Sequence, residues 1–220
     1  MRREIITTSD GSKTIHLPDW DESYHSKHGA VQEAYHVFIK NGLRLFDNRS
    51  INILEIGFGT GLNAIITLIE AEKQNLKVNY TGIEAYPVSV EEALEMNYLQ
   101  SLDAIEKLPL FEKMHQFPFA EQFKLSDNFN FEKRNIFFNE IDDINSFDLI
   151  YFDAFGFRVQ PELWSTEIFE KMFHALKDKG VLVTYAARGV VKRSMQEVGF
   201  SVEKLAGPPG KREMMRAFKM

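Results

Sequence analysis

The strand-to-helix junction at residues 53–61 constrains the fold more than any other part of the chain. It reads ILEIGFGTG, an apolar run, an acid and then a glycine at every second position, and a helical pattern begins at Leu62. A buried parallel strand that turns sharply into a helix while its backbone contacts a ligand needs residues without a Cβ atom. The junction therefore predicts a nucleotide-type binding turn, with cofactor contacts from Gly57, Phe58, Gly59, Gly61 and Asn63.

The spacing of these glycines narrows the ligand. A dinucleotide fingerprint, G-x-G-x-x-G, would place its third glycine at position 62, which is Leu62. Glu55 lies two residues before Gly57, where a carboxylate repels phosphate and suits a cation such as the amino group or sulfonium of S-adenosylmethionine. We therefore expect S-adenosyl-L-methionine as the cofactor, and a nucleotide-dependent oxidoreductase is disfavoured. The pattern E-x-G-x-G-x-G resembles motif I of the Rossmann-like methyltransferases.

Two more acids close apolar runs further along the chain. Glu84 follows the run at 78–83, about 20 residues on, where such folds place the acceptor for the ribose hydroxyls. Asp153 ends the apolar run at 147–152. The ligand crevice of an open parallel sheet lies beyond the carboxyl ends of its strands, so Glu55, Glu84 and Asp153 are expected to converge there. Taken singly, each acid could instead be a loop cap.

Weaker candidates lie outside these strand ends. Glu140 is predicted to reach the adenine amino group, and its neighbours Asp142 and Asp143 are equal candidates for that contact. Gln32 and Glu33 lie on the helical pattern that begins at Ala30 and are predicted to contact the cofactor or an amine substrate. A solvated helical face explains Gln32 and Glu33 equally well.

Composition excludes several classes of protein. With 220 residues, of which 44% are hydrophobic, the chain can bury one substantial core, so one main domain is expected. The absence of cysteine excludes disulfides, thiolate zinc sites and cysteine-ligated iron–sulfur clusters, which favours polar methyl transfer over radical chemistry. His25, His28 and His36 lack a standard zinc spacing, so no metal is expected. No apolar stretch of about 20 residues occurs, and a soluble, cytoplasmic protein is expected.

Charge is distributed unevenly along the chain. The net charge is −6, yet the segment from Arg188 onward holds eight basic and three acidic residues. Such asymmetry predicts a localised phosphate-binding face on an otherwise acidic body, although an ordinary solvated surface is an equal alternative. The residues chosen for phosphate contacts are Lys192, Arg193, Lys211 and Arg212.

The order of elements predicts an α/β fold in two parts. Residues 1–50 form an N-terminal extension that covers the cofactor, with a β-hairpin around Asp10-Gly11 and a helix at 30–46. Residues 51–220 alternate strands and helices, which predicts a seven-stranded, mostly parallel sheet. Strands are expected at 51–56, 78–84, 133–138, 147–153, 180–186, 200–205 and 212–219. Helices are expected at 61–73, 87–98, 165–177 and 189–198, with a helical insertion at about 101–130.

Four blocks, taken in order, carry a more specific resemblance. They are residues 24–38, the glycine turn at 55–63, residues 152–155 followed by Pro161-Glu162-Leu163-Trp164, and residues 210–214, which read GKREM. Together they resemble the methyltransferase part of the MnmC family, which modifies the wobble uridine of bacterial tRNA. The resemblance implies a Rossmann-like class I fold and S-adenosylmethionine-dependent N-methylation of 5-aminomethyl-2-thiouridine to 5-methylaminomethyl-2-thiouridine.

The resemblance also implies partners and roles. The partners are the tRNA anticodon loop and a separate FAD-dependent oxidase, or another supplier of the aminomethyl precursor, because the chain is expected to be the stand-alone transferase. Asp153 would orient the amine and help its proton leave. The target base would stack on an aromatic ring from Tyr24, Phe155, Phe157 or Trp164, each of which core packing explains as well.

One departure from the family and three rivals remain. Relatives usually carry Ala-Pro where this chain has Gly156-Phe157, so the loop around the target base is expected to differ. The first rival is a small-amine methyltransferase or aminopropyltransferase on the same fold. The others are the nucleotide-dependent oxidoreductase and a catalytically silent tRNA-binding module.

Overall fold

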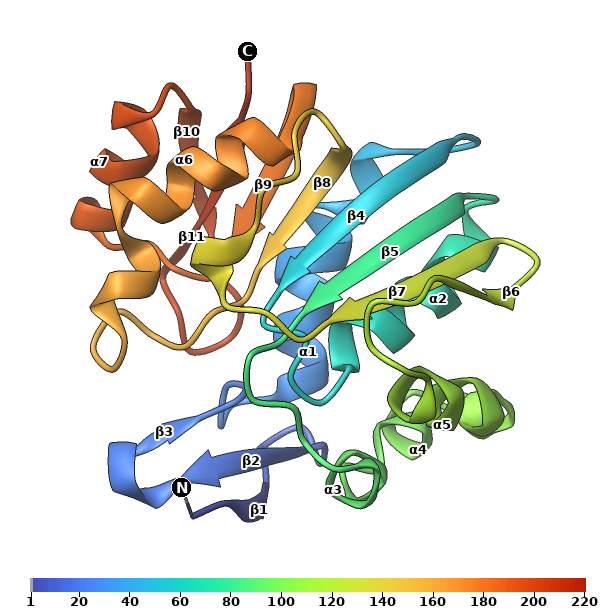
Figure 1. The fold of residues 1–220 in the computed structure, drawn as a ribbon. Helices are drawn as coiled ribbons and strands as arrows, with labels where there is room; N and C mark the ends of the chain where they lie inside the picture. The colour runs from blue at the N-terminus through green and yellow to red at the C-terminus, as the bar shows by residue number, and fades with distance from the viewer. Residues whose placement is uncertain (1) are drawn as a thin grey trace.

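The computed structural model describes residues 2–220 and is built around one eight-stranded sheet (Figure 1). Its five central strands are parallel, whereas β6, β10 and β11 run antiparallel to their neighbours. The strands lie in the order β10 (Ser201–Ala206), β11 (Glu213–Phe218), β9 (Leu176–Thr184), β8 (Phe147–Phe152), β4 (Ser50–Ile56), β5 (Lys77–Ile83), β7 (Phe129–Arg134) and β6 (Phe123–Ser126).

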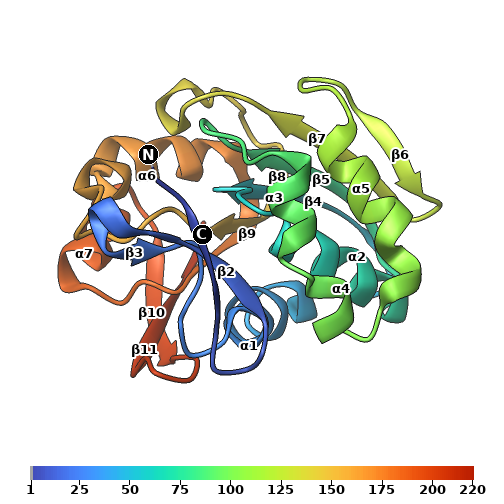
Figure 2. The ribbon, with the colours of Figure 1, turned by 90° about the horizontal axis from the view of Figure 1, so that it is seen from below.

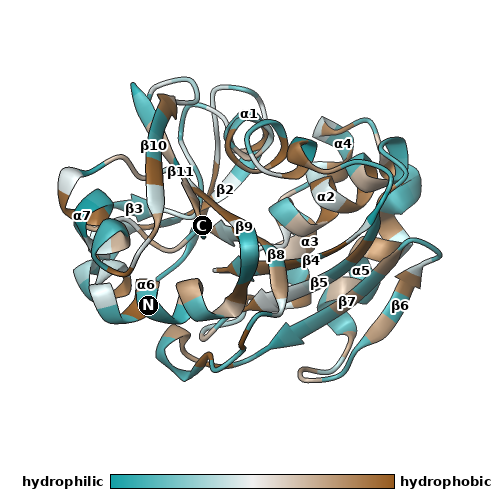
Figure 3. Cartoon of the chain, turned by 90° about the horizontal axis from the view of Figure 1, so that it is seen from above, coloured by the Kyte–Doolittle hydropathy of each residue, from teal (hydrophilic) through white to brown (hydrophobic). Residues whose placement is uncertain are grey.

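Helices cover both faces of this sheet. One face carries α6 (Thr166–Ala175) and α7 (Gly189–Glu197); the other carries α1 (Ala30–Ala34), a π-helical turn (Tyr35–Lys40) and α2 (Leu62–Lys73) (Figures 1 and 3). The second layer continues in α3 (Val90–Glu95), α4 (Tyr98–Ser101) and α5 (Leu108–Gln116). Short 3-10 helices lie at Pro18–Trp20, Leu43–Leu45, Ile105–Lys107, Phe138–Glu140 and Pro161–Trp164.

The sequence of β4 explains why the sheet is buried on both sides. Ile51 and Ile53 pack into the core beneath α2, while Leu54 and Ile56 pack into the core beneath α6. Successive side chains of a strand point to opposite faces, so a strand buried on both faces must be apolar at nearly every position. The same logic holds for β8, all of whose residues are buried.

A small antiparallel sheet from the N-terminus lies across the carboxyl ends of the parallel strands (Figure 2). It consists of β1 (Glu4–Thr7), β2 (Lys13–Leu17) and β3 (Glu22–Ser23). Ion pairs join it to distant parts of the chain: Arg3 contacts Glu92 at 2.8 Å, and Arg158 contacts Glu22 at 3.5 Å. We call residues 2–29 the cover.

The α/β Rossmann-like prediction is confirmed, but the count of seven strands and the helical nature of 101–130 are wrong in part. The extra strand β6 lies within that segment and pairs with β7, which occupies 129–134 instead of the expected 133–138. The alternation of Phe129, Phe131 and Lys133 toward the interior is a strand pattern, with Asp127-Asn128 as its turn. The high aromatic content of the segment does not by itself reveal this alternation at every second residue.

Two expected helices are broken. The helix expected at 30–46 turns π-helical at Tyr35 and ends before Gly42, where a Cβ atom would lie 2.5 Å from Phe38 O. The helix expected at 87–98 is split into α3 and α4 by Asn97, which adopts a left-handed φ of 55°. Within residues 2–220, no helix is long and apolar enough to cross a membrane.

Candidate active site

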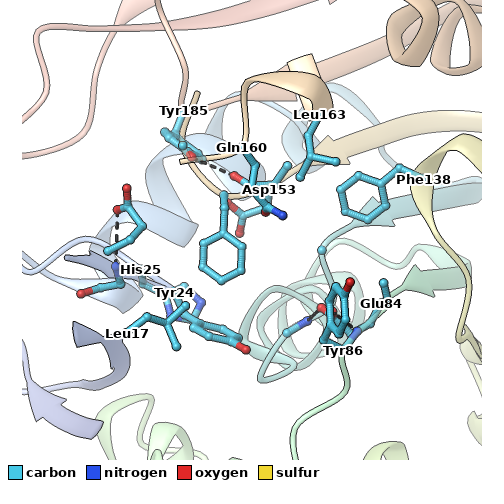
Figure 4. Close-up of a pocket in the computed structure, with 18 of the residues that line it drawn as sticks. Leu17, Tyr24, His25, Glu84, Tyr86, Phe138, Asp153, Gln160, Leu163 and Tyr185 are labelled. Carbon is cyan, nitrogen blue, oxygen red and sulfur yellow. Dashed lines mark hydrogen bonds between the residues drawn. The ribbon is translucent and has the colours of Figure 1, made fainter. Parts of the chain in front are cut away.

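A cavity of about 1220 Å³ lies between the cover and the carboxyl ends of β4, β5 and β8 (Figure 4). Strand order reverses between β4 and β8, which is where open parallel sheets bind their ligands. Small-ligand pockets usually measure roughly 300–1,000 Å³. This cavity therefore has room for a second reactant beside a nucleoside-sized cofactor.

The glycine turn forms the floor of the cavity. Gly57, Gly59 and Gly61 have φ values of 88°, 53° and 77°, a region that side-chain-bearing residues avoid. At Gly57 a Cβ atom would lie 2.6 Å from Asp153 O, so the turn packs directly on the residue that follows β8. Gly57 and Phe58 donate their backbone N–H groups to Ile83 O at 3.0 and 2.9 Å, which locks the turn onto β5.

Glu84 lies beside this turn at the end of β5. Its two carboxylate oxygens accept the backbone N–H groups of Gly59 and Tyr86, each at 2.9 Å (Figure 4). Each oxygen retains a lone pair that can accept a ligand hydroxyl. The arrangement fits the ribose contact that the sequence predicts for Glu84.

The other two strand-end acids are bridged by one amide. The side-chain nitrogen of Asn63 donates to Glu55 Oε1 at 2.9 Å and to Asp153 Oδ2 at 2.8 Å. Tyr80 donates its hydroxyl to Glu55 Oε2 at 2.8 Å. Glu55 is fully buried and does not line the cavity, so its role is to hold the Asn63 side chain by a hydrogen bond. Of these two acids, Asp153 is the one that lines the cavity.

Burial makes both acids hard to ionise. It raises the pKa of Glu55 well above its ordinary value, against the hydrogen bonds from Tyr80 and Asn63. Burial and the neighbouring Glu33 raise the pKa of Asp153 to about 7, while Asn63 and Lys211 act in the opposite direction. Asp153 can therefore exchange a proton near neutral pH.

A third charged group faces the cavity from the far side. Glu33 on α1 accepts a hydrogen bond from Lys211 Nζ through Oε1 and from the Ser26 backbone N–H, at 2.9 Å, through Oε2. The Lys211 ammonium also lies 3.8 Å from the centre of the Tyr185 ring. Lys211, which the sequence predicts to contact phosphate, is thus engaged by Glu33 and Tyr185 in the cavity wall.

The four aromatic candidates separate into two groups. Tyr24 and Phe155 line the cavity with ring centroids 5.1 Å apart, and burial raises the pKa of Tyr24 to about 12. Trp164 lies outside the cavity lining, is almost fully buried, and donates its indole N–H to Phe155 O at 2.8 Å. Phe157 is also outside the lining and packs under the Arg188 guanidinium. Only the first pair can stack directly on a ligand in the cavity.

Several predicted residues do not line the cavity. Glu140 is exposed and accepts the Phe137 backbone N–H at 2.7 Å in a short 3-10 turn. Gln32 is exposed on α1, and Gly61 lies at the start of α2 against His115. Lys192, Arg193 and Arg212 also lie outside the lining, and Arg193 and Arg212 are exposed.

Comparison with known proteins identifies the fold and the reaction class. A family model described as S-adenosyl-L-methionine-dependent methyltransferase matches residues 92–220, which is more than half of the chain. The chain belongs to this methyltransferase family.

Individual relatives agree with this assignment. The bifunctional tRNA 5-methylaminomethyl-2-thiouridine biosynthesis protein MnmC of Burkholderia pseudomallei strain K96243 is 28% identical over 230 residues, a match that covers 96% of this chain and 34% of that protein. The chain thus spans about a third of the length of such relatives. Among solved structures, MnmC2 from Aquifex aeolicus superposes with a TM-score of 0.71 at 24% identity, covering 98% of this chain and 70% of that one.

A second solved structure shows how widely this fold is used. Spermidine synthase from Thermotoga maritima has a TM-score of 0.58 at 14% identity, covering 100% of this chain and 72% of that one. At this identity the likeness concerns the fold alone.

The cavity of this methyltransferase fits S-adenosyl-L-methionine. The side-chain oxygen of Asn63 is buried and has no hydrogen-bond partner among the described residues. An acceptor oxygen beside the Asp153 carboxylate suits the ammonium of an amino acid moiety. Gly57 and Gly59 line the cavity with their backbone, and Glu84 is placed for hydroxyl groups. The prediction of this cofactor, drawn from Glu55 and the glycine spacing, is confirmed by the family.

Sequence reasoning missed several residues of the cavity wall. Tyr185 donates its hydroxyl to Ala154 O at 2.8 Å and carries the Lys211 ammonium on its ring, and Tyr86 lies beside Glu84 at the rim (Figure 4). His25 lines the cavity, and burial lowers its pKa to about 4, so it is a neutral imidazole at neutral pH. No sequence spacing predicts that these three residues share one cavity, because they come from segments that are distant in the sequence. Within residues 2–220, His, Asp and Glu form no group of three that could hold a metal.

Proposed function

We propose that this methyltransferase N-methylates the primary amine of 5-aminomethyl-2-thiouridine at the wobble position of tRNA, giving 5-methylaminomethyl-2-thiouridine. The observation that carries the proposal is Asp153, a carboxylate with a pKa of about 7 that faces a cavity large enough for two reactants. The relatives whose names specify this nucleoside match almost the whole chain and support the choice of substrate.

The chemistry needs an unprotonated amine. When bound, S-adenosyl-L-methionine supplies a methyl group attached to a positively charged sulfur. An alkylammonium has no free lone pair, so Asp153 accepts an N–H hydrogen bond and then the proton, directly or through water. Asn63 fixes the Asp153 carboxylate from one side at 2.8 Å. Holding the amine in attack geometry is worth up to about 7–11 kcal/mol of the barrier.

The base would enter from the side of the cover. A wobble nucleotide lies in a single-stranded loop, so it can leave its neighbours without breaking a duplex and stack on an aromatic side chain. Tyr24 and Phe155 form an edge-to-face pair on the cavity wall and are our choice for this contact. We assign Trp164 to a supporting role, because its indole N–H holds the backbone of Phe155.

The proposed RNA-binding face is centred on α7 and the loop before β11. Lys192, Arg193 and Arg212 are the cations chosen, and Lys211 is withdrawn from this set because Glu33 engages it. Charge reversal at Lys192 and Arg193 should weaken tRNA binding and flatten its salt dependence, measured by fluorescence anisotropy at several salt concentrations. The matched control is Lys124→Glu, an exposed lysine on β6 at the far edge of the sheet. An unchanged salt slope in the double variant would refute this face.

A second candidate is methyl or aminopropyl transfer to a small amine. The observation in its favour is the charge of the cavity, whose lining includes seven carboxylates and three basic side chains among residues 2–220. An acidic wall attracts polyamines, but it attracts a cationic aminomethyl base equally well. A short diamine offered in place of tRNA separates the two candidates.

The decisive experiment is mass spectrometry of wobble nucleosides from tRNA that lacks this modification, after incubation with protein and methyl donor. We expect the 5-methylaminomethyl nucleoside with the wild type. Asp153→Ala should reduce its formation by about 10²–10⁴-fold, while binding of S-adenosyl-L-methionine by calorimetry changes much less. An active Asp153→Ala variant would remove the assignment of Asp153.

Three further parts of the proposal concern context. We propose that the protein acts in the cytoplasm, on a precursor supplied by an FAD-dependent oxidase or another enzyme that exposes the aminomethyl group. We also propose that residues 1–50 act as a unit that covers the cofactor and that residues 51–220 form the transferase core. Limited proteolysis with and without cofactor tests this division.

A further inference from the structure

The pair formed by Lys211 and Glu33 lies where it can act on Asp153 through charge. Both side chains line the same cavity as Asp153. Glu33 is only 10% exposed and Lys211 33% exposed, so water screens neither group fully. Tyr185 connects the two sides: its ring lies 3.8 Å from the Lys211 ammonium, and its hydroxyl bonds to Ala154 O, one residue after Asp153.

The backbone around Lys211 is fixed, so its ammonium is not a freely moving charge. Gly207 donates its N–H to Arg212 O at 3.1 Å, and Lys211 donates its N–H to Pro208 O at 2.9 Å, which closes a turn before β11. On the other side, Glu33 is held by the Ser26 backbone N–H. Because the Lys211 ammonium and the Glu33 carboxylate are both held in place, each acts on the Asp153 carboxylate from a fixed position in the cavity wall.

We propose that Lys211 and Glu33 are positioning residues that set the protonation of Asp153, Lys211 favouring the carboxylate and Glu33 opposing it. This inference rests on the proposed function, in which Asp153 takes the proton of the substrate amine. The two partners are 178 residues apart in sequence, so the pair also fastens the turn before β11 to α1. A purely structural tether is the alternative that the experiment must exclude.

Other ionisable groups around Asp153 come from every neighbouring element. Glu55 on β4 and Tyr80 on β5 lie behind Asn63, Tyr98 comes from α4, and Tyr185 follows β9. Burial raises the pKa of each of these four groups, so the three tyrosines stay neutral at neutral pH. Glu33 and Lys211 act on Asp153 by charge in opposite directions, and the lining also carries Glu22 and Glu84.

The two substitutions Glu33→Gln and Lys211→Met break the same contact but remove opposite charges. A tether predicts the same outcome for both. The charge role predicts opposite outcomes: the pKa of Asp153 falls in Glu33→Gln and rises in Lys211→Met, each by on the order of half a pH unit. Lys211→Arg keeps the positive charge and is the matched control, and Lys211→Gln replaces Lys211→Met if the methionine variant does not fold.

The measurement is carbon-13 NMR titration of aspartate carboxyl groups in the free protein, with the Asp153 resonance assigned by its loss in Asp153→Asn. Shifts of opposite sign in the two variants, with Lys211→Arg close to wild type, support the inference. Shifts of the same sign, or none, overturn it and leave the tether. Because the titration needs no substrate, it is independent of the proposed function, which would fail separately if the wild type formed no 5-methylaminomethyl nucleoside in tRNA.

Discussion

The floor and the cover of the cavity are built in opposite ways. The floor is a continuous segment, the glycine turn at 57–61, whose backbone hydrogen bonds run to Ile83 on the adjacent strand. The cover is the N-terminal sheet at residues 2–29, held by side chains that are far away in sequence, such as Arg158 and Glu92. The floor therefore depends on local backbone geometry, and the cover depends on long-range contacts between side chains.

This difference determines what a substitution does in each half. Backbone conformations with positive φ favour glycine, and a clash of a new Cβ atom with neighbouring backbone cannot relax by moving a side chain. Exposed ion pairs, in contrast, contribute little to stability and can be replaced by water. Substitutions in the floor should affect folding and cofactor affinity together, whereas substitutions in the ion pairs of the cover should loosen the cover with little change in stability.

The largest effect is expected from Gly57→Ala, with Gly11→Ala as its match in the cover. Gly57 and Gly11 have nearly equal φ values, 88° and 84°, but a Cβ atom at Gly57 meets Asp153 O at 2.6 Å and one at Gly11 meets nothing within 4 Å. We expect Gly57→Ala to lower the free energy of unfolding by about 3 kcal/mol or more and Gly11→Ala by about 1–2 kcal/mol. Urea denaturation measures both, and equal losses would contradict the role of the Asp153 contact.

The glycine turn is the part of the molecule that the sequence predicts best. Apolar runs and glycine spacing predict strands β4, β5 and β8, helix α2 and the placement of Glu84. They do so because the backbone conformation of such a segment requires particular residue types within the segment itself. The role of Glu55 is less visible. Only the structure shows that its oxygens are used by Tyr80 and Asn63, since nothing in the sequence tells which strand-end acid faces the ligand.

The next effect tests the buried support behind the floor. Tyr80→Phe removes the hydroxyl that bonds to Glu55 Oε2 and leaves that buried oxygen without a donor, at an expected cost of about 1–3 kcal/mol. The control is Tyr35→Phe, whose hydroxyl bonds to Glu70 at 3.3 Å. Glu70 keeps Lys73 at 2.6 Å, so that cost should stay below about 1 kcal/mol. Thermal unfolding of the two variants should therefore differ, and similar midpoints would mean that Glu55 does not depend on Tyr80.

A third prediction uses the titration of Asp153. Its pKa is raised from the ordinary value of 3.8 to about 7, so the folded state binds more protons than the unfolded state between these limits. The contribution of Asp153 to stability is therefore greatest near pH 4 and falls as the pH rises to 7, by at most about 1.4 kcal/mol per pH unit. Asp153→Asn removes this dependence. Denaturation of both proteins from pH 4 to 8 should show the stability of the wild type falling relative to that of Asp153→Asn up to about pH 7 and staying constant above it.

The cover is where the sequence is least informative. The hairpin at 4–17 is predictable from its alternation and its Asp-Gly turn, but the contacts that place it over the cavity are not. The sequence places Lys211 in a basic segment, and only the structure shows its contact with Glu33, 178 residues away. Tyr24 and Phe155 meet in the same way, from segments that are far apart in the sequence. Side-chain pairs between distant segments leave no periodic pattern to read.

The smallest effect on stability is expected from Arg158→Ala, which releases the cover from the loop after β8. Arg158 donates to the backbone oxygens of Trp20 and Asp21 at 3.1 and 2.8 Å and is 57% exposed, so its loss should cost less than about 1 kcal/mol. Hydrogen exchange should nevertheless become faster at residues 20–24 and remain unchanged at 57–61, because only the cover loses a contact. Lys124→Ala, which breaks an exposed pair with Asp127 on the β6–β7 hairpin, should leave both segments unchanged. Faster exchange at the glycine turn in Arg158→Ala would show that the floor depends on the cover. The floor could then no longer be described as built by local backbone geometry alone.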